Sequence, residues 1–119
     1  MLLFINYPKC STCRKAKKWL DDNGVEYTSR DVSAEPLSTA EIERWFPLSG
    51  VEIKKFFNTC SGPYKELGLK DKLSSMNNDE KLTLLSENAM LVKRPLLVSE
   101  NFVLVGFKSD EWSAALKND

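Results

Sequence analysis

The sequence predicts an α/β fold in which helices surround a mixed sheet of four strands. Residues 2–32 contain an apolar run, a helical stretch and a second strand-like run, which is typical of a parallel βαβ unit. After Arg94-Pro95, two short apolar runs are separated by two residues, which is typical of an antiparallel hairpin. Residues 33–92 carry no strand pattern. The order βαβ, helices, ββα therefore places a helical insertion between the second and third strands.

The first three elements each have a local sequence signal. Residues 2–6 form a short apolar run, and residues 11–23 have a helical period that Asn23-Gly24 ends. The apolar face of this helix carries Cys13, Ala16 and Leu20. Residues 25–32 place apolar side chains among polar ones and predict the second strand. A right-handed crossover should make the two strands parallel.

The insertion should consist of short helices. Ser38 is a good N-cap and Glu41 completes a capping box, so a helix should begin there, and Pro47 should end it. Residues 58–63 have the composition of a loop. Further helical segments are expected at 53–57, 64–69 and 78–87, the last of them capped by Asn77 or Asn78.

The end of the chain predicts a hairpin and a final helix. Residues 96–99 and 102–105 are the two apolar runs, and Asn101 in the turn between them tolerates positive φ. An amphipathic helix should begin at Ser109, with Trp112, Ala115 and Leu116 on its apolar side. Trp19, Trp45 and Trp112 occupy apolar helix positions, and we expect all three in or beside the core.

Length and composition are those of a soluble globular protein. The chain has 119 residues, of which 42% are hydrophobic and 29% are charged. We expect a single domain over 1–119, with a core formed by 1–32 and 94–117 and an insertion over about 33–92. No apolar run is as long as a membrane span, and the start of the chain lacks the features of a secretory signal. These observations predict a cytoplasmic protein, and we expect a monomer.

The charged residues and the absence of histidine exclude several classes of site. Seventeen basic and seventeen acidic residues cancel, which argues against direct nucleic-acid binding. Without histidine, Cys-His and Ser-His-Asp catalysis are excluded, and three cysteines are too few for a closed zinc site. We therefore expect no metal. The cations are unevenly distributed along the sequence. Five of them lie close to Cys10 and Cys13: Lys9, Arg14, Lys15, Lys17 and Lys18.

The pair Cys10-Ser11-Thr12-Cys13 lies between the first strand and the first helix. Backbone N–H groups and the helix dipole favour a thiolate at a helix N-terminus. Cys10 should be the accessible nucleophile, and Cys13, one turn further on, should resolve a mixed disulfide. The alternative is that both are ordinary buried cysteines. A reducing compartment argues against a structural disulfide.

Five other residues have two interpretations each. Arg94 could hold an anion or stabilise the Cys10 thiolate, or it could be an exposed solvated cation. Pro95, which precedes a strand, could have a cis peptide bond that brings backbone next to the cysteine loop, although cis bonds are uncommon. Cys60 is more easily explained as a passive residue than as a third redox thiol. Lys9 and Arg14 could contact an anion or a partner, or be solvated.

Five segments of the sequence resemble the ArsC/Spx family, and in particular its short members of the Spx/MgsR type. They are residues 7–16, which contain the cysteine pair, the Glu-Pro-Leu-Ser turn at 35–38, Phe-Asn-Thr at 57–59, Lys-Arg-Pro at 93–95 and Val-Gly-Phe at 105–107. The resemblance implies a thioredoxin-like fold with a helical insertion between the second and third strands. It also implies a cis bond before Pro95, with Pro95, Ser11 and Thr12 shaping the site around the catalytic residues Cys10, Cys13 and Arg94.

The resemblance implies two kinds of function. ArsC-type arsenate reductases attack arsenate with one cysteine, hold the oxyanion with three arginines and use glutathione as reductant. Cys10 and Arg94 match that pattern, whereas Cys60 stands where relatives often carry arginine, and Lys108 is the only cation just after the last strand. Spx-type members use the cysteine pair as a redox switch and bind the C-terminal domain of the RNA polymerase α subunit. This chain ends soon after its last helix and lacks the longer tail of Spx.

Four hypotheses follow. The first is a cytoplasmic thiol–disulfide oxidoreductase that needs no cofactor beyond its own cysteine pair and an external thiol donor such as thioredoxin or a glutathione-like thiol. The second is a redox-sensing transcriptional regulator that binds the polymerase α C-terminal domain. The third is a true arsenate reductase, and the fourth is an inert domain whose cysteines only pack.

Overall fold

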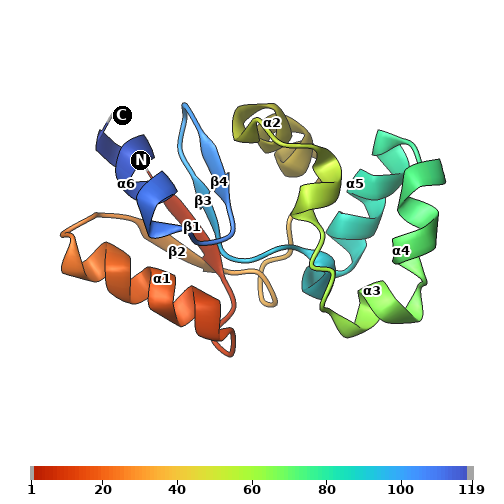
Figure 1. Cartoon of the computed structure of the whole chain (residues 1–119), viewed down its shortest axis with the longest axis horizontal. Helices are drawn as coiled ribbons and strands as arrows, with labels where there is room; N and C mark the ends of the chain where they lie inside the picture. The colour runs from red at the N-terminus through yellow and green to blue at the C-terminus, as the bar shows by residue number, and fades with distance from the viewer. Residues whose placement is uncertain (1, 118–119) are drawn as a thin grey trace.

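The computed structural model describes residues 2–117 and contains a mixed sheet of four strands (Figure 1). The strands are β1 (Leu3–Asn6), β2 (Thr28–Asp31), β3 (Leu96–Val98) and β4 (Val103–Val105). Their order is β2-β1-β3-β4, with β1 parallel to β2, β1 antiparallel to β3, and β3 antiparallel to β4. The predicted mixed sheet, with its parallel βαβ unit and its hairpin, is confirmed.

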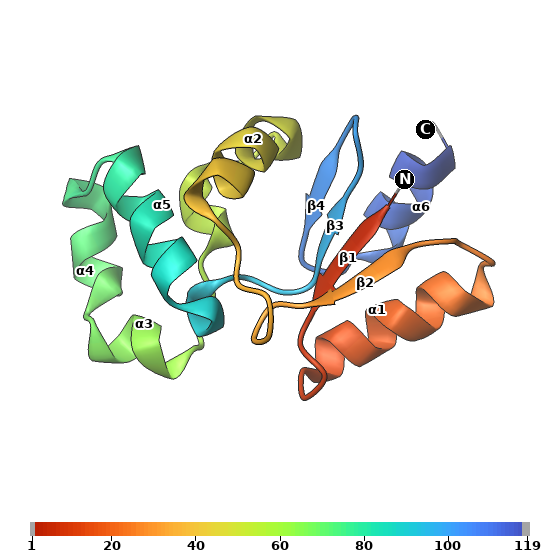
Figure 2. The ribbon, with the colours of Figure 1, turned by 180° about the vertical axis from the view of Figure 1, so that it is seen from behind.

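Two helices cover one face of this sheet. They are α1 (Ser11–Asp22) and α6 (Ser109–Lys117), which lie on the same side in both ribbon views (Figures 1 and 2). Phe4 of β1 pairs with Leu97 of β3, and both side chains are fully buried in one cluster with Trp112. Since side chains alternate along a strand, this register sends the neighbouring residues to the other face.

The insertion covers the other face, where Ile5 and Leu96 are buried in a second cluster. Its elements are α2 (Thr39–Ser49), η1 (Ile53–Phe56), α3 (Gly62–Glu66), α4 (Leu69–Lys72), η2 (Leu73–Ser75), α5 (Asn78–Glu87) and η3 (Ala89–Leu91). In Figure 2, α2 lies beside the sheet, and α3, α4 and α5 lie farther from it. Within residues 2–117, no helix is both long and apolar enough to span a bilayer.

The insertion returns to the sheet immediately before Arg94. A β-bridge pairs Phe57 with Val92, and the N–H of Lys93 donates to the carbonyl of Phe56 at 2.7 Å. These contacts join residues far apart in the sequence. They hold η1 beside the segment that carries Arg94, which brings part of the insertion to the candidate site.

Two helix boundaries differ from the sequence prediction. Pro47 lies inside α2, which continues to Ser49 and stops where Gly50 adopts a φ of 69°. Proline removes one backbone donor, yet the residues after it keep helical geometry until the left-handed glycine ends the helix. Residues 64–69 are not one helix either, because Gly68, with a φ of 63°, separates α3 from α4.

The second strand and the hairpin turn also differ in detail. Strand β2 begins at Thr28, because the N–H of Val25 donates to the carbonyl of Leu20 at 3.0 Å and closes the end of α1. The hairpin joins β3 and β4 where predicted, with a backbone bond from Ser99 to Phe102 of 2.8 Å. Asn101 has no positive φ, which within 2–117 is confined to glycines.

The ion pair of Arg30 with Glu41 fixes the start of α2 to the sheet. The two carboxylate oxygens of Glu41 lie 2.6 and 3.0 Å from the two terminal guanidinium nitrogens of Arg30. The backbone N–H of Ser38 also donates to the Glu41 carboxylate at 3.0 Å. The hydrogen bonds from Arg30 outweigh burial and lower the pKa of Glu41 from 4.5 to about 2. The ion pair therefore stabilises the folded protein fully at pH values above 4.5, the usual pKa of glutamate, and this stabilisation is lost as pH falls towards 2.

We expect Glu41→Gln to lower the free energy of unfolding at neutral pH by about 1–3 kcal/mol, the range for hydrogen bonds to charged groups. Urea unfolding of both proteins as a function of pH measures the difference, which should narrow as pH falls from 4.5 to about 2. Glu43→Gln is the matched control, because Glu43 is exposed on the same helix. A difference that stays constant over this pH range would contradict the assignment.

Candidate functional site

Cys10 lies at the N-terminal end of α1, after the loop that leaves β1. It is the N-cap residue with extended backbone, φ −88° and ψ 117°. Its N–H donates to the carbonyl of Tyr7 at 2.9 Å, and its carbonyl accepts the first helical bond from Arg14 at 3.1 Å. The sulfur accepts a hydrogen bond from the backbone N–H of Cys13 at 3.3 Å. Half-buried and at the positive end of a helix, this sulfur is where negative charge is favoured.

Cys13 lies one turn further along α1 and is only 2% exposed. Burial first, and then the hydrogen bond of its thiol to Cys10, raise the pKa of Cys13 to about 12. For Cys10, burial acts against ionisation, but hydrogen bonds from the Cys13 thiol and backbone and from Arg94 outweigh it, so the pKa of Cys10 is below its usual value. The first sulfur therefore ionises more readily than the second, whose raised pKa keeps it a thiol.

Arg94 approaches Cys10 from the segment before β3. The Arg94-Pro95 peptide bond is cis, as the resemblance implies, and Pro95 is buried. The guanidinium carbon lies 5.2 Å from the centroid of the Tyr7 ring, and one terminal nitrogen lies 3.4 Å from the carbonyl of Val92. Arg94 is half-buried rather than an exposed cation, and it lowers the pKa of the Cys10 thiol.

The ε nitrogen of Arg94 is buried and has no hydrogen-bond partner within the described structure. A buried donor without a partner has a free-energy cost, so native proteins seldom leave one unpaired. Near a sulfur whose pKa is lowered, such a donor is suited to an atom of a bound substrate.

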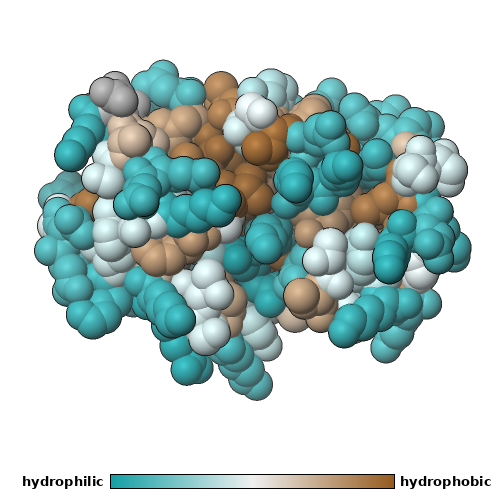
Figure 3. Space-filling model, viewed as in Figure 1, coloured by the Kyte–Doolittle hydropathy of each residue, from teal (hydrophilic) through white to brown (hydrophobic). Residues whose placement is uncertain are grey.

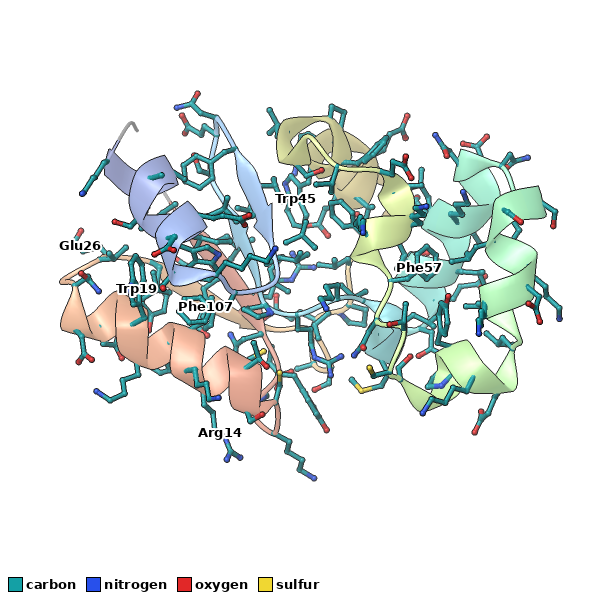
Figure 4. All side chains as sticks on the ribbon, viewed as in Figure 1. Arg14, Trp19, Glu26, Trp45, Phe57 and Phe107 are labelled. Carbon is teal, nitrogen blue, oxygen red and sulfur yellow. The ribbon has the colours of Figure 1, made fainter. Side chains whose placement is uncertain are left out.

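The other predicted site residues lie around this centre. Ser11 and Thr12 occupy the exposed first turn of α1, and Lys9 is exposed in the loop before it. Arg14 is not brought to the thiols, because its ε nitrogen donates to the carbonyl of Pro8 at 2.9 Å. Figure 4 shows its side chain pointing outward from the start of α1. Arg14 therefore holds the cysteine loop.

A hollow of about 420 Å³ opens beside Arg94 and Thr12. It is lined by Thr12, Val51, Lys55, Lys93, Arg94, Val105, Gly106, Phe107, Lys108 and Glu111. Two of its lysines, Lys55 and Lys93, were not predicted from the sequence. Lys93 could have been found from its position next to Arg94, but Lys55 reaches the hollow only because the insertion folds back. Tyr7, which stacks on Arg94, was not assigned a role either.

A second, apolar hollow of about 560 Å³ lies at the opposite end of β1 from the cysteines, between the sheet and α2. Figure 3 shows hydrophobic residues gathered between the β3–β4 hairpin and α2. Leu3, Trp45, Leu48 and Val98 contribute to its lining. No cysteine lines it, so this hollow is not the candidate site.

A family model described as the ArsC family matches residues 5–115. The chain belongs to the ArsC family. A structure of an ArsC family related protein from Bacteroides fragilis is 53% identical, with a TM-score of 0.93 and 95% of each chain covered. YusI of Bacillus subtilis (strain 168) is 48% identical over 93% of this chain and 94% of its own length. The global transcriptional regulator Spx of Listeria innocua is 29% identical over 93% of this chain and 83% of its own length. The thioredoxin-like fold is thereby confirmed.

This ArsC family protein brings one of its four arginines to the cysteine pair. Arg94 lies near enough to Cys10 to lower the pKa of its thiol, whereas Arg14 bonds the loop, Arg30 pairs with Glu41 and Arg44 lies at the apolar hollow. A site that binds an oxyanion through three guanidinium groups is therefore incomplete here.

Cys60 lies elsewhere, exposed in the insertion between η1 and α3. Its backbone N–H donates to the side-chain oxygen of Asn58 at 3.1 Å. Within residues 2–117, no three acidic, cysteine or histidine side chains are grouped closely enough to hold a metal ion. The reactive groups that the described structure brings together at the end of α1 are the Cys10–Cys13 pair and Arg94.

Proposed function

We propose that the protein is a thiol–disulfide oxidoreductase in which Cys10 is the nucleophile and Cys13 the resolving thiol. One observation carries this proposal: the Cys10 sulfur accepts from Cys13 at a helix N-terminus and has a lowered pKa, while Cys13 has a pKa of about 12. A low pKa with partial exposure is what a nucleophilic thiol needs. The inert-domain hypothesis offers no reason for this asymmetry.

The reaction has two exchange steps. The Cys10 thiolate attacks one sulfur of a substrate disulfide, whose S–S bond breaks and releases one thiolate that takes a proton from solvent. Cys13 then loses its proton and attacks the Cys10 sulfur, which releases the second substrate thiol and leaves a Cys10–Cys13 disulfide. Burial still raises the pKa of Cys13 before this second step, but the contribution of the Cys10 anion is lost once Cys10 has become a neutral disulfide sulfur, so the Cys13 proton leaves more easily.

Two electrons pass from the cysteine pair to the substrate, so an external thiol must restore the pair. A thioredoxin-type or glutathione-like donor would serve, and no bound cofactor is needed. Such a cycle fits a reducing compartment, and we place the protein in the cytoplasm on that ground.

The variant Cys13→Ser should trap the substrate on Cys10. Without the resolving thiol, the mixed disulfide should be released at least about 10²-fold more slowly, because the intramolecular attack is lost. Mass spectrometry of the non-reduced protein after incubation with a cell extract would identify the adduct and its site. Cys60→Ser is the matched control and should release substrate as the wild type does. Adducts found on Cys60, or none at all, would count against the proposed roles.

A second candidate is redox-dependent regulation of transcription. It is supported by the relative of 29% identity, a global transcriptional regulator whose match covers 93% of this chain. In this role, oxidation of the Cys10–Cys13 pair would change a surface that binds the C-terminal domain of the polymerase α subunit. Calorimetry with that domain, using reduced and oxidised protein, tests it. Binding in neither state would exclude this candidate and leave the exchange activity unaffected.

A further inference from the structure

Two hollows of the protein share Lys55 as a lining residue, and both are rich in cations. The first is the hollow of about 420 Å³ beside Arg94, and the second, of about 440 Å³, lies in the insertion. The second is lined by Glu52, Lys54, Lys55, Thr59, Tyr64, Lys70, Leu73, Ser74 and Lys81. We define the basic groove by the cations of both hollows: Lys54, Lys55, Lys70, Lys81, Lys93, Arg94 and Lys108.

The acids of the groove do not balance these cations. Glu52 and Glu111 are the two acidic lining residues, and each already has a partner: Glu52 lies 3.3 Å from Lys54, and Glu111 lies 3.9 Å from Lys108. Within residues 2–117, no acidic side chain pairs with the remaining groove lysines, which are Lys55, Lys70, Lys81 and Lys93. In a chain with equal numbers of acids and bases, this is a local excess of positive charge that attracts anions.

Folding gives no reason for this concentration of charge. Lys55, Lys70 and Lys93 are exposed, so they add little to the core, and like charges that are close together repel one another. The hydroxyl groups of Thr59 and Ser74 also line the insertion hollow and add hydrogen-bond donors for an anion.

One end of the groove lies next to the cysteine pair. It is formed by Arg94, which lowers the pKa of the Cys10 thiol, and by Thr12, which lies between the two cysteines in the sequence. The other end is formed by Lys70 of α4 and Lys81 of α5, which belong to the part of the insertion farthest from the sheet (Figure 1). A ligand that occupies both hollows therefore extends from the thiol site into the insertion, which is farther than a single small anion reaches.

We propose that the basic groove binds an acidic segment of a protein whose disulfide is reduced at Cys10. This inference rests on the proposed thiol–disulfide exchange and names its substrate class. A protein fits better than a nucleic acid, because the groove ends at a thiol and nucleic acids contain no disulfide to react with it. The acidic segment takes no part in the electron transfer, since the two exchange steps are those given above. It raises the local concentration of the substrate disulfide beside the Cys10 thiolate.

Three synthetic disulfide peptides test this inference with the full-length reduced protein. They share one cystine and differ in the flanking run, which consists of glutamates, of serines and glycines, or of lysines. Stopped-flow measurement of peptide thiol release gives the rate constant for each. We expect the acidic peptide to react about 10-fold or more faster than the neutral one at low salt. The advantage should disappear at about 1 M salt, where the Debye length is only ~3 Å.

The double variant Lys70→Glu/Lys81→Glu identifies the surface responsible. Neither residue contacts the cysteines, so the neutral peptide should react at the wild-type rate while the acidic peptide loses its advantage. Lys72→Glu/Lys117→Glu is the matched control, because it makes the same change in net charge at exposed lysines outside the groove. If both double variants reduce the acidic-peptide rate equally, net charge explains the preference and the groove proposal is overturned.

The remaining outcomes separate this inference from the proposed function. If the neutral peptide reacts but the acidic one is no faster, the groove proposal fails and thiol–disulfide exchange stands. If no peptide reacts, the proposed exchange fails, and the groove proposal fails with it. If the peptides react equally and Lys70→Glu/Lys81→Glu alone abolishes binding of a fluorescent single-stranded oligonucleotide, the groove binds nucleic acid and the proposal is overturned.

Discussion

Replacing Cys10 by serine should abolish disulfide exchange. The loss should be at least about 10³-fold, as is usual when a covalent nucleophile is removed, because a serine hydroxyl at this position has no base to ionise it. Cys13 cannot replace it, since it is 2% exposed and its pKa is about 12. The measurement is the rate of thiol release from a small neutral disulfide. Cys60→Ser should retain the wild-type rate, and a Cys10→Ser protein that is still active would require another nucleophile.

The same prediction has a pH signature. With Cys60 replaced by serine, alkylation of the protein by iodoacetamide should follow a titration whose midpoint lies below the usual cysteine pKa, because the Cys10 thiolate is the reacting form. Arg94→Gln should move the midpoint upward, since Arg94 lowers the pKa of the Cys10 thiol and glutamine carries no positive charge. A midpoint at the ordinary value in the wild type would mean that the helix end and Arg94 do not activate Cys10.

The fold was largely predictable, because its signals are local. The capping box of Ser38 with Glu41 and the apolar period of α1 are set by residues within a few positions of one another. The boundaries that were mispredicted depend on φ values that only glycine adopts easily. Gly50, and not Pro47, ended α2, and Gly68 divided the segment expected as one helix. A proline is a visible signal in a sequence, but the backbone angle of a nearby glycine is not.

The candidate site was predictable where it is local and unpredictable where the insertion contributes. The pair Cys10–Cys13 lies within one helical turn, so a strand followed by a helix was sufficient to place it at an N-terminus. Lys55 is distant in sequence, and only the β-bridge of Phe57 with Val92 brings its element to Arg94. The basic groove could not be predicted from the net charge of zero either, because the net charge of a chain does not show which charged residues lie together on its folded surface.

Trp112 connects the core to the segment that carries Arg94. It is fully buried, and its ring packs edge to face with Phe107 at a centroid distance of 4.9 Å. Figure 4 shows Trp19 and Phe107 between α1 and the start of α6, the region this cluster fills. The indole N–H donates to the carbonyl of Gly106 at 3.1 Å, and the N–H of Gly106 donates to the carbonyl of Pro95 at 2.8 Å. Trp112 thus holds the turn that positions Pro95.

We therefore expect Trp112→Ala to lower the free energy of unfolding by about 3–5 kcal/mol, as for other large-to-small changes of buried aromatic residues. This is a large part of the 5–15 kcal/mol that is typical of a whole protein, so much of the variant should be unfolded or easily unfolded. Trp112→Phe keeps an aromatic ring but leaves the buried Gly106 carbonyl without its donor, at a cost of about 1–3 kcal/mol.

Urea unfolding followed by far-ultraviolet circular dichroism measures the stability of both Trp112 variants. The control is Leu67→Ala, because Leu67 is 41% exposed. This change should alter the free energy of unfolding by less than about 0.5 kcal/mol. Because Trp112→Phe should remain folded, it also separates the two roles of Trp112. If the hydrogen bond to Gly106 positions Pro95, exchange with a neutral disulfide should slow in the folded variant. If Trp112 only fills the core, stability alone should fall. A loss of less than about 1 kcal/mol in Trp112→Ala would contradict its place at the centre of this cluster.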